Sequence, residues 1–396
     1  MADLPLAGLR VLEMSQIIAA PYCGQMLGDM GAEVIKIEVP DGGDVSRSYG
    51  PHKLGDLSYY FCAFNRNKDS LTLNLKHAGA AAVLRELIRR SDVFVHNSLA
   101  ASIERLGFSY EQVRDLNPRL VYCAISGYGR IGPDKDTAAL DMAAQAASGV
   151  MYLTGEPDGR PMRAGVPIAD LVAGMFAAYA ILAALRQRDR TGEGQLVDTS
   201  LLESSAALTS YLASQYLATG ENPPRLGNAH PSIVPYDSYR CADDYVVVAG
   251  ANQGIWERFC RALGLDTLTE DPRFRTGADR SANRDALNEL ISRRMAASRA
   301  AEVVALLRPA GVPCDIVRDL HGVLSGPQAE ALGLVQQLSR DGFDVPVLAP
   351  PYHLAAADGG FARRPPPTLG EHTDKWLREV GLSEGEIAKL RAEGAV

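Results

Sequence analysis

Asp170 is the side chain best placed to do chemistry in this sequence of 396 residues. It stands at the start of a long apolar helix predicted over 170–188. Its neighbours in the sequence include the small residues Gly165, Ala169, Ala173 and Gly174. A carboxylate at a helix N-terminus accepts free backbone amides and is favoured by the helix dipole, so we expect Asp170 to stay ionised when water is excluded. Two interpretations follow: a structural helix cap, or a nucleophile with room around it for a ligand.

Other polar residues are weaker candidates on their own. Asp141 and Gln145 lie four residues apart on a predicted helix, with Asp141 as a cap of that helix. His230 precedes Pro231 and is typical of a turn residue rather than a base. Arg47 follows Gly-Asp in a loop, where an arginine is usually solvated but can also pair with an anion.

The stretch Gly127-Tyr-Gly129-Arg-Ile-Gly132 matches the dinucleotide fingerprint G-x-G-x-x-G after a predicted strand. A phosphate loop must open directly into a helix, whereas Pro133-Asp-Lys-Asp136 follows here. No acidic residue ends a second strand about 20 residues later. A glycine-bent loop is therefore favoured over a nicotinamide site.

Composition excludes several classes of protein. The chain is 46% hydrophobic and 22% charged with a net charge of -8, which is typical of a globular protein and unlike a nucleic-acid or membrane-surface binder. The six cysteines are scattered without C-x-x-C, which indicates reduced thiols and no zinc site. The uncharged stretch 171–185 is shorter than the roughly 18 to 20 residues that span a bilayer, and no signal peptide is recognisable, so we expect a cytoplasmic protein.

The elements that must position these residues alternate along the first part of the chain. Strands are predicted at 9–14, 34–38, 71–75, 93–95 and 120–125, and helices at 23–30 and 78–90. Such alternation predicts an α/β fold with a parallel sheet, which binds ligands beyond the carboxyl ends of its strands. Helices at 170–188 and 201–218 and a hairpin of 236–241 with 245–249 follow.

Proline and glycine mark the domain boundaries. The stretch 219–235 holds six of them and is the best linker in the sequence. We therefore expect a large domain over 1–218, a linker over 219–235 and a small α+β domain over 236–330. Residues 331–396 would form a second, Pro-rich linker and a C-terminal segment that returns to the large domain.

Ordered motifs along nearly the whole chain resemble the class III CoA-transferases, the family of formyl-CoA and carnitine CoA-transferases. Besides Asp170, they include Gly8-Leu-Arg-Val-Leu-Glu13, Leu27-Gly-Asp-Met-Gly31, Asn65-Arg-Asn67-Lys68, Ser126-Gly-Tyr-Gly129, Thr191-Gly-Glu-Gly194 and Gly311-Val-Pro-Cys314. The resemblance implies a Rossmann-like large domain and a smaller α+β domain, with two ring-like chains interlocked as a homodimer.

The resemblance also implies a mechanism. Asp170 would attack an acyl-CoA thioester to give an aspartyl anhydride and CoA thiolate, and the thiolate would return to give an aspartyl-CoA thioester. Water must stay out because these intermediates hydrolyse. Backbone amides of 127–132 or near Gly250 are alternative oxyanion donors. No cofactor is bound permanently and no metal is required, because the coenzyme A thioester is itself a substrate.

Further roles are carried over by the same resemblance. The expected coenzyme A contacts are Ile18, Ala19, Leu73, Lys76, Asn97, Ser98 and Arg105. Val39 replaces an arginine of formyl-CoA transferase. Tyr49 stands where the oxalate-specific enzyme has tryptophan, which disfavours oxalate. The branch that acts on succinyl-CoA and small dicarboxylates is favoured instead, with Arg47, Arg225 or His230 as the hypothetical group that holds the remote carboxylate.

Two alternatives remain open. A racemase of the same fold needs acid and base groups, but its histidine aligns with Leu140 and its glutamate with Gln253, neither of which can replace them. A catalytically silent CoA-binding subunit would not need the nucleophile. Retention of Asp170 therefore argues for transfer.

Overall fold

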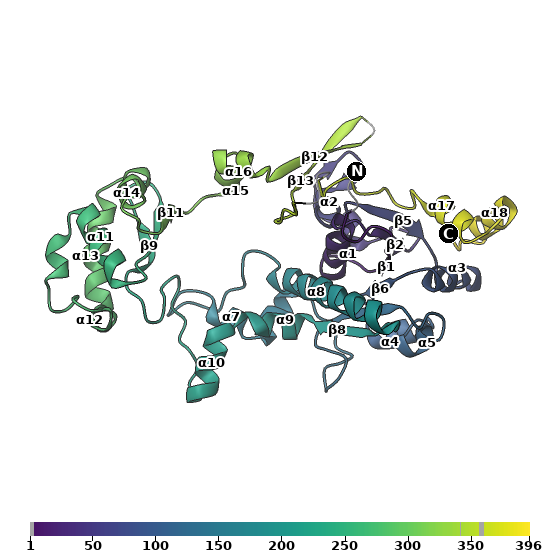
Figure 1. Ribbon diagram of the computed structural model, residues 1–396, viewed down its shortest axis with the longest axis horizontal. Helices are drawn as coiled ribbons and strands as arrows, with labels where there is room; N and C mark the ends of the chain where they lie inside the picture. The colour runs from purple at the N-terminus through teal and green to yellow at the C-terminus, as the bar shows by residue number, and fades with distance from the viewer. Residues whose placement is uncertain (1–3, 341, 356–359) are drawn as a thin grey trace. The chain divides into compact units, whose positions relative to one another are not determined.

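The computed structural model describes residues 4–340, 342–355 and 360–396 of the chain (Figure 1). The chain divides into two compact units. The first unit comprises Met1–Met151, Arg163–Thr219 and Gln328–Val396, and the second comprises Tyr152–Met162 and Gly220–Pro327. The stretch Tyr152–Met162, which the sequence-based division placed in the large domain, lies with the second unit because Gly227 N donates to Gly155 O there (3.0 Å).

The first unit is built on a six-stranded sheet in the order β5-β2-β1-β6-β7-β8, in which every neighbouring pair is parallel. Its strands are β1 (Arg10–Met14), β2 (Glu33–Glu38), β5 (Lys68–Thr72), β6 (Val93–His96), β7 (Val121–Ser126) and β8 (Leu196–Ser200). The predicted α/β class and parallel sheet are confirmed. The strand order reverses between β1 and β6, so a ligand site is expected beyond the carboxyl ends of these two strands.

Helices cover both faces of this sheet (Figure 1). One face packs against α1 (Ala19–Asp29) and α8 (Ile168–Thr191), and the other against α3 (Ala78–Arg89), α17 (Thr373–Glu379) and α18 (Glu384–Ala392). Alternate residues of each strand enter the two cores: Val11 of β1 faces α1 and α8, whereas Leu12 faces α3. Burial on both faces explains why these strands read as apolar runs.

Several predicted boundaries are wrong for identifiable reasons. Strand β5 begins at Lys68, ahead of the predicted 71–75, because Lys68, Asp69 and Ser70 are buried although they are polar. The helix predicted over 201–218 is two helices, α9 (Leu201–Leu208) and α10 (Ser210–Thr219), because Ser210 has a φ of 53°. Strand β8 was not predicted.

The second unit is an α+β arrangement. Its sheet has the order β11-β10-β9 and is antiparallel, with β9 (Tyr236–Arg240), β10 (Tyr245–Ala249) and β11 (Cys314–Ile316). The predicted hairpin is therefore confirmed. The main helices α11 (Gln253–Leu263), α13 (Arg284–Ala296) and α14 (Ala300–Leu307) enclose one apolar core with this sheet.

Shorter elements complete the two units. They are β3 (Lys53–Leu54), β4 (Leu57–Ser58), α2 (Tyr59–Phe64), α4 (Ala100–Arg105), α5 (Tyr110–Arg114), α6 (Asp141–Ala147), α7 (Val150–Leu153), α12 (Gly277–Ala282), α15 (Leu320–Leu324), α16 (Pro327–Leu332), β12 (Val335–Arg340) and β13 (Phe343–Leu348). The stretch predicted as a Pro-rich linker holds the β12–β13 hairpin, whose Val345 and Val347 pack against Leu57 and Cys62.

Candidate active site

Asp170 is the third residue of α8, one turn inside the first unit's longest helix. The residue at the N-cap position is Pro167, and no side chain caps that position. Among the described residues, no hydrogen bond to the Asp170 carboxylate is found. The structural-cap interpretation therefore lacks the hydrogen bond that would define it.

A second carboxylate performs the capping instead. Asp141 Oδ1 accepts the amide of Ala169 (2.9 Å), and its Oδ2 accepts Gln145 Nε2 (2.7 Å). Gln145 is fully buried, and its Oε1 accepts the amide of Ala164 (2.8 Å). Asp141 thus caps α8 across space rather than its own helix, whose N-cap is Leu140. The pair predicted by its four-residue spacing fixes the segment that leads into Asp170.

The prediction that Asp170 stays fully ionised is wrong. Burial, and secondly the negative charge of Asp141, raise the pKa of Asp170 to about 7. No hydrogen-bond donor offsets these two effects, and the helix dipole alone does not. The Asp170 carboxyl therefore changes its protonation state near neutral pH, a range in which a carboxylate nucleophile is partly available.

Tyr60 is a residue of this site that sequence reasoning missed. Burial raises the pKa of the Tyr60 phenol, and the charges of Asp170 and Asp141 raise it further, so its hydroxyl lies within electrostatic range of both. The predicted substrate residue Tyr49 packs edge-on against Tyr60, with 5.3 Å between ring centroids. Only the aromatic cluster at 59–61 marked this position in the sequence, and such clusters usually indicate core.

Close packing of α1 against α8 brings the predicted residues Ile18 and Ala19 to the helix that carries Asp170. A Cβ at Gly174, one turn after Asp170, would lie 2.5 Å from Ala19 O. Only glycine permits this approach, because a methyl group there would overlap the backbone of α1. Two expected coenzyme A contacts therefore lie beside the helix that carries Asp170.

Gly174→Ala tests whether this packing matters for the site. Although alanine favours helices, we expect the variant to lose about 1–3 kcal/mol of unfolding free energy, because its methyl group must push α1 away from α8. Turnover should fall with it. The matched control is Gly165→Ala, where a Cβ meets nothing within 4 Å. Urea unfolding and steady-state rates of both variants check this, and equal effects would refute the packing argument.

Buried charges support the turn that joins β1 to α1. Lys36 Nζ contacts Glu13 Oε1 (3.0 Å) and Asp44 Oδ2 (2.9 Å), and Lys68 Nζ contacts Glu13 Oε2 (2.7 Å), with all four side chains fully buried. Asp44 Oδ1 also accepts the amide of Ile17 (3.1 Å), whose φ of 73° is unusual for a branched residue. The network holds this turn in a conformation that its own backbone disfavours.

A cavity of about 520 Å³ lies where the strand order reverses. Four of the predicted coenzyme A residues line it, namely Leu73, Lys76, Asn97 and Ser98. Asn97 also joins the two loops at this edge, since it accepts the amide of Gln16 (3.1 Å) and donates to Gln16 O (2.9 Å). The edge that the resemblance assigns to coenzyme A is therefore an open cleft.

The other three predicted coenzyme A contacts do not line this cavity. Ile18 and Ala19 are buried beside it. Arg105 donates to Ser102 Oγ (3.2 Å), and Ser102 lines the cavity, so Arg105 lies at its border. Val39 lines it too, as the apolar residue where formyl-CoA transferase has arginine.

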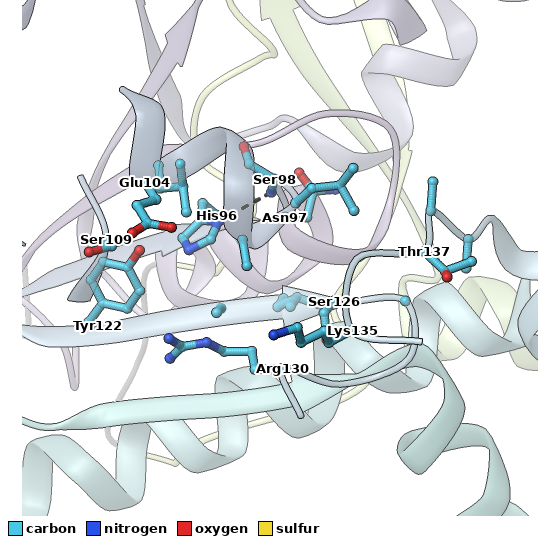
Figure 2. A pocket seen from close by; sticks show the side chains of 18 of the residues that line it. His96, Asn97, Ser98, Glu104, Ser109, Tyr122, Ser126, Arg130, Lys135 and Thr137 are labelled. Carbon is cyan, nitrogen blue, oxygen red and sulfur yellow. Dashed lines mark hydrogen bonds between the residues drawn. The ribbon is translucent and has the colours of Figure 1, made fainter. Parts of the chain in front are cut away.

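A smaller cavity of about 250 Å³ adjoins the first one beyond β6 and β7 (Figure 2). In Figure 2, Arg130 and Lys135 reach toward it from the loop after β7, and His96 lies in its wall. Burial and the nearby charge of Arg130 lower the pKa of His96 to about 3, so the imidazole is neutral. Gly129 and Gly132 adopt positive φ in this loop, and no helix follows before α6, as predicted for a glycine-bent loop.

The three hypothetical carboxylate binders are engaged in other contacts. Arg47 pairs with Glu38 through Nε and Nη2 (both 2.7 Å) and stacks over Phe61, 3.7 Å from the ring centroid. In the second unit, Arg225 donates to Tyr152 O (3.1 Å) and Gly159 O. His230 Nδ1 accepts the amide of Ser232 (3.1 Å). The substrate roles of these residues stay predictions.

Within the described ranges, no group of three or more His, Cys, Asp or Glu side chains could hold a metal ion. One helix, α8, is long and apolar enough to cross a membrane by length and composition, but it packs into the core of the first unit. This is weak evidence for a membrane span.

Comparison with known proteins agrees with this fold. A model of CoA-transferase family III matches residues 6–373. A succinate–glutarate CoA-transferase of Agrobacterium fabrum is 37% identical over 96% of both chains, and a succinyl-CoA:mesaconate CoA-transferase of Haloarcula marismortui is 36% identical over 96% of this chain and 97% of its own. The crystal structure of a CAIB/BAIF family protein from Brucella suis has a TM-score of 0.86 at 36% identity, covering 96% of this chain and all of that one.

These matches extend over both units, and the parallel sheet with its cleft at the strand reversal is the scaffold that such an enzyme needs. The chain belongs to CoA-transferase family III. It is a CoA-transferase, as the sequence resemblance implied.

Proposed function

We propose that this enzyme moves coenzyme A from succinyl-CoA to a small dicarboxylic acid, with Asp170 as the nucleophile. The observation that carries the proposal is a carboxylate without a hydrogen-bond partner among the described residues, half-buried at the start of a core helix beside the α1 turn. Relatives named for succinate, glutarate and mesaconate support the choice of substrates.

The chemistry balances without a proton donor or an external base. A carboxylate oxygen of Asp170 attacks the thioester carbonyl, and the C–S bond breaks to release CoA thiolate and leave a mixed anhydride. The thiolate attacks the aspartyl carbonyl and expels succinate, which leaves aspartyl-CoA. The acceptor carboxylate then repeats both steps in reverse and frees Asp170. Each intermediate keeps an activated acyl group, so exchange replaces hydrolysis.

The two positions that align with the racemase's catalytic residues hold no acid–base pair in this chain. Leu140 is an exposed apolar side chain. Gln253 donates to Glu257 Oε1 (3.2 Å) and accepts from Arg280 (3.0 Å), as a neutral amide does. Neither group can hold a proton for abstraction at carbon.

The proposed transfer is tested with purified enzyme, succinyl-CoA and isotopically labelled glutarate, mesaconate, citramalate, itaconate, malate, hydroxymethylglutarate and oxalate. Mass spectrometry should detect new thioesters of the dicarboxylates and little of oxalate. A racemase would instead exchange the α-hydrogen of a 2-methylacyl-CoA in deuterium oxide. Absence of every labelled thioester would reject the proposal and favour the silent CoA-binding subunit.

Lys76 is proposed to bind the phosphates of coenzyme A. The side chain is exposed at the lining of the larger cavity, where an ammonium group can pair with a phosphate. Lys76→Ala should therefore raise KM for succinyl-CoA about tenfold, with KM for the acid unchanged. Lys389→Ala, which removes an exposed lysine of α18, is the matched control. Steady-state kinetics distinguish them, and an equal rise in both KM values would argue against a phosphate contact.

The finer architecture is proposed on the same grounds. We propose that two chains interlock as a homodimer in the cytoplasm, with the large domain over 1–218, the small domain over 236–330 and linkers at 219–235 and after 330. Exposed apolar residues on α8 and α10, among them Tyr179 and Leu217, suit a buried dimer surface. Light scattering of the purified chain measures the oligomeric state.

A further inference from the structure

His96 is a buried histidine with one ring nitrogen unused. It ends strand β6 and is only 3% exposed. Its Nδ1 accepts the amide of Ser98 (3.2 Å), so in the neutral ring Nε2 carries the hydrogen. Nε2 is itself buried, and it has no hydrogen-bond partner within the described ranges 4–340, 342–355 and 360–396. A buried N–H without an acceptor is costly, which points to an acceptor that comes from outside the chain.

A second histidine makes the same backbone contact without burying the other nitrogen. His77 Nδ1 accepts the amide of Gly79 (3.1 Å), which is again two residues ahead. Its Nε2 lies 3.4 Å from Glu393 Oε2, and its side chain is 31% exposed. The contact between Nδ1 and the backbone therefore does not require a buried, unused Nε2, and the placement of His96 needs another explanation.

The His96 ring is a fixed, neutral donor. Burial, and secondly the charge of Arg130, lower the pKa of the imidazole to about 3, so near neutral pH it carries one proton. The rings of Phe94 and Tyr122 pack against it, with 5.9 and 5.2 Å between centroids. Since these contacts and the Ser98 amide hold the imidazole, its N–H cannot turn to water.

The same His96 ring lies in the wall of the smaller cavity, of about 250 Å³ (Figure 2). Arg130 and Lys135, from the loop after β7, line that cavity too. In the described part of the chain, the contact of the Arg130 guanidinium with an acid is a distant one, 3.7 Å from Glu111 Oε1. The cavity thus combines a buried N–H donor with a guanidinium whose donors are largely uncommitted.

Two carboxylates also line the smaller cavity, but both can avoid a negative ligand. Glu104 is exposed, and the Glu111 side chain is 69% exposed, so either group can point into water. The buried His96 donor has no such freedom. We therefore take His96 and Arg130 as the groups that decide which ligand fits.

We propose that the smaller cavity binds a small oxyanion, whose carboxylate or phosphate oxygens accept hydrogen bonds from His96 Nε2 and the Arg130 guanidinium. A forked guanidinium matches such oxygens well. The volume is several times the share of one water molecule in the liquid, about 30 Å³, so an ion of several heavy atoms fits. The site goes beyond the proposed function, because neither the chemistry of Asp170 nor the expected coenzyme A contacts use His96 or Arg130.

The experiment measures binding of inorganic phosphate and of acetate to the full-length enzyme by isothermal titration calorimetry. Saturating CoA is present to occupy the larger cavity, and Lys76→Ala is titrated in parallel to exclude binding at that lysine. The tighter of the two ions identifies the class of oxyanion. Binding should persist in Lys76→Ala. Loss of binding in Lys76→Ala, or complete displacement by CoA, would place the ion in the coenzyme A cleft and overturn the proposal.

His96→Phe removes the buried donor while a ring still fills the space. We expect it to weaken binding of the preferred ion at least about tenfold. The matched control is His77→Phe, which removes the equivalent Nδ1 contact with a backbone amide and should bind the ion as the wild type does. Equal affinity of His96→Phe and the wild type, or no binding of either ion to the wild type, would overturn the proposal.

Arg130→Gln provides a second variant in case His96→Phe fails to fold, because Arg130 lies on a loop and is only partly buried. It should also weaken binding about tenfold. Arg114→Gln, which changes an exposed arginine of α5 outside the cavity lining, is the control and should leave binding unchanged. Glu104→Gln removes a negative charge from the lining and should strengthen binding. Weaker binding in Glu104→Gln would indicate a cationic ligand and contradict the proposal.

Discussion

Asp170→Asn is expected to lower CoA transfer by at least about a thousandfold, with the protein still folded. The amide has nearly the shape of the carboxylate but cannot form an anhydride. The Asp170 carboxylate makes no hydrogen bond with the described residues, so no structural contact is lost with its charge. In the wild type, rapid quenching after mixing with succinyl-CoA should leave added mass on the peptide that contains residue 170.

The matched control is Asp189→Asn, which changes an exposed aspartate near the other end of the same helix. It should keep full activity and the same covalent adduct on Asp170. A wild-type rate in Asp170→Asn, or an adduct on another peptide, would show that a different nucleophile does the chemistry.

The alternation of strands and helices was predictable because burial on both faces of a parallel sheet leaves long apolar runs. Prediction failed where buried residues are polar. Lys68 and Asp69 look like loop residues, but they pair with Glu13 and Lys375, which are distant in sequence. Such pairing exists only after folding, so the start of β5 could not be found from local composition.

The candidate site could likewise be predicted only in part. Asp170 could be predicted from the family motifs and from its place in the helix, and Lys76 and Asn97 from the family resemblance alone. Two other features depend on residues that meet only in space: the capping of α8 by Asp141, and the position of Tyr60. The raised pKa of Asp170 has the same origin, because burial and Asp141 act together there.

The carboxylate of Asp141 is expected to control both the position and the pKa of Asp170. Asp141→Ala removes the acceptor of the Ala169 amide and the partner of Gln145, so the first turn of α8 loses its anchor. A shift of about 1 Å in a nucleophile can cost about a hundredfold in rate, and we expect a loss of kcat of that order. KM for succinyl-CoA should change less, because Asp141 lies outside the lining of the larger cavity.

Asp141→Asn removes the charge, while its Oδ1 can still accept the amide of Ala169. Asp170 must be ionised to attack, so kcat/KM of the wild type should fall as pH decreases through about 7. Removal of the negative charge of Asp141 lowers the pKa of Asp170, which moves this acid limb to lower pH. Tyr60, whose phenol is within electrostatic range of Asp170, stays neutral throughout this range because its pKa is raised.

Gln145→Ala is the matched control for this shift, since it disturbs the same anchor without changing any charge. Its rate should fall while its acid limb stays where it is in the wild type. If Asp141→Asn left the limb unmoved, the charge of Asp141 would not reach Asp170. If Gln145→Ala moved it equally, geometry rather than charge would set the pKa, because only Asp141→Asn removes a neighbouring negative charge.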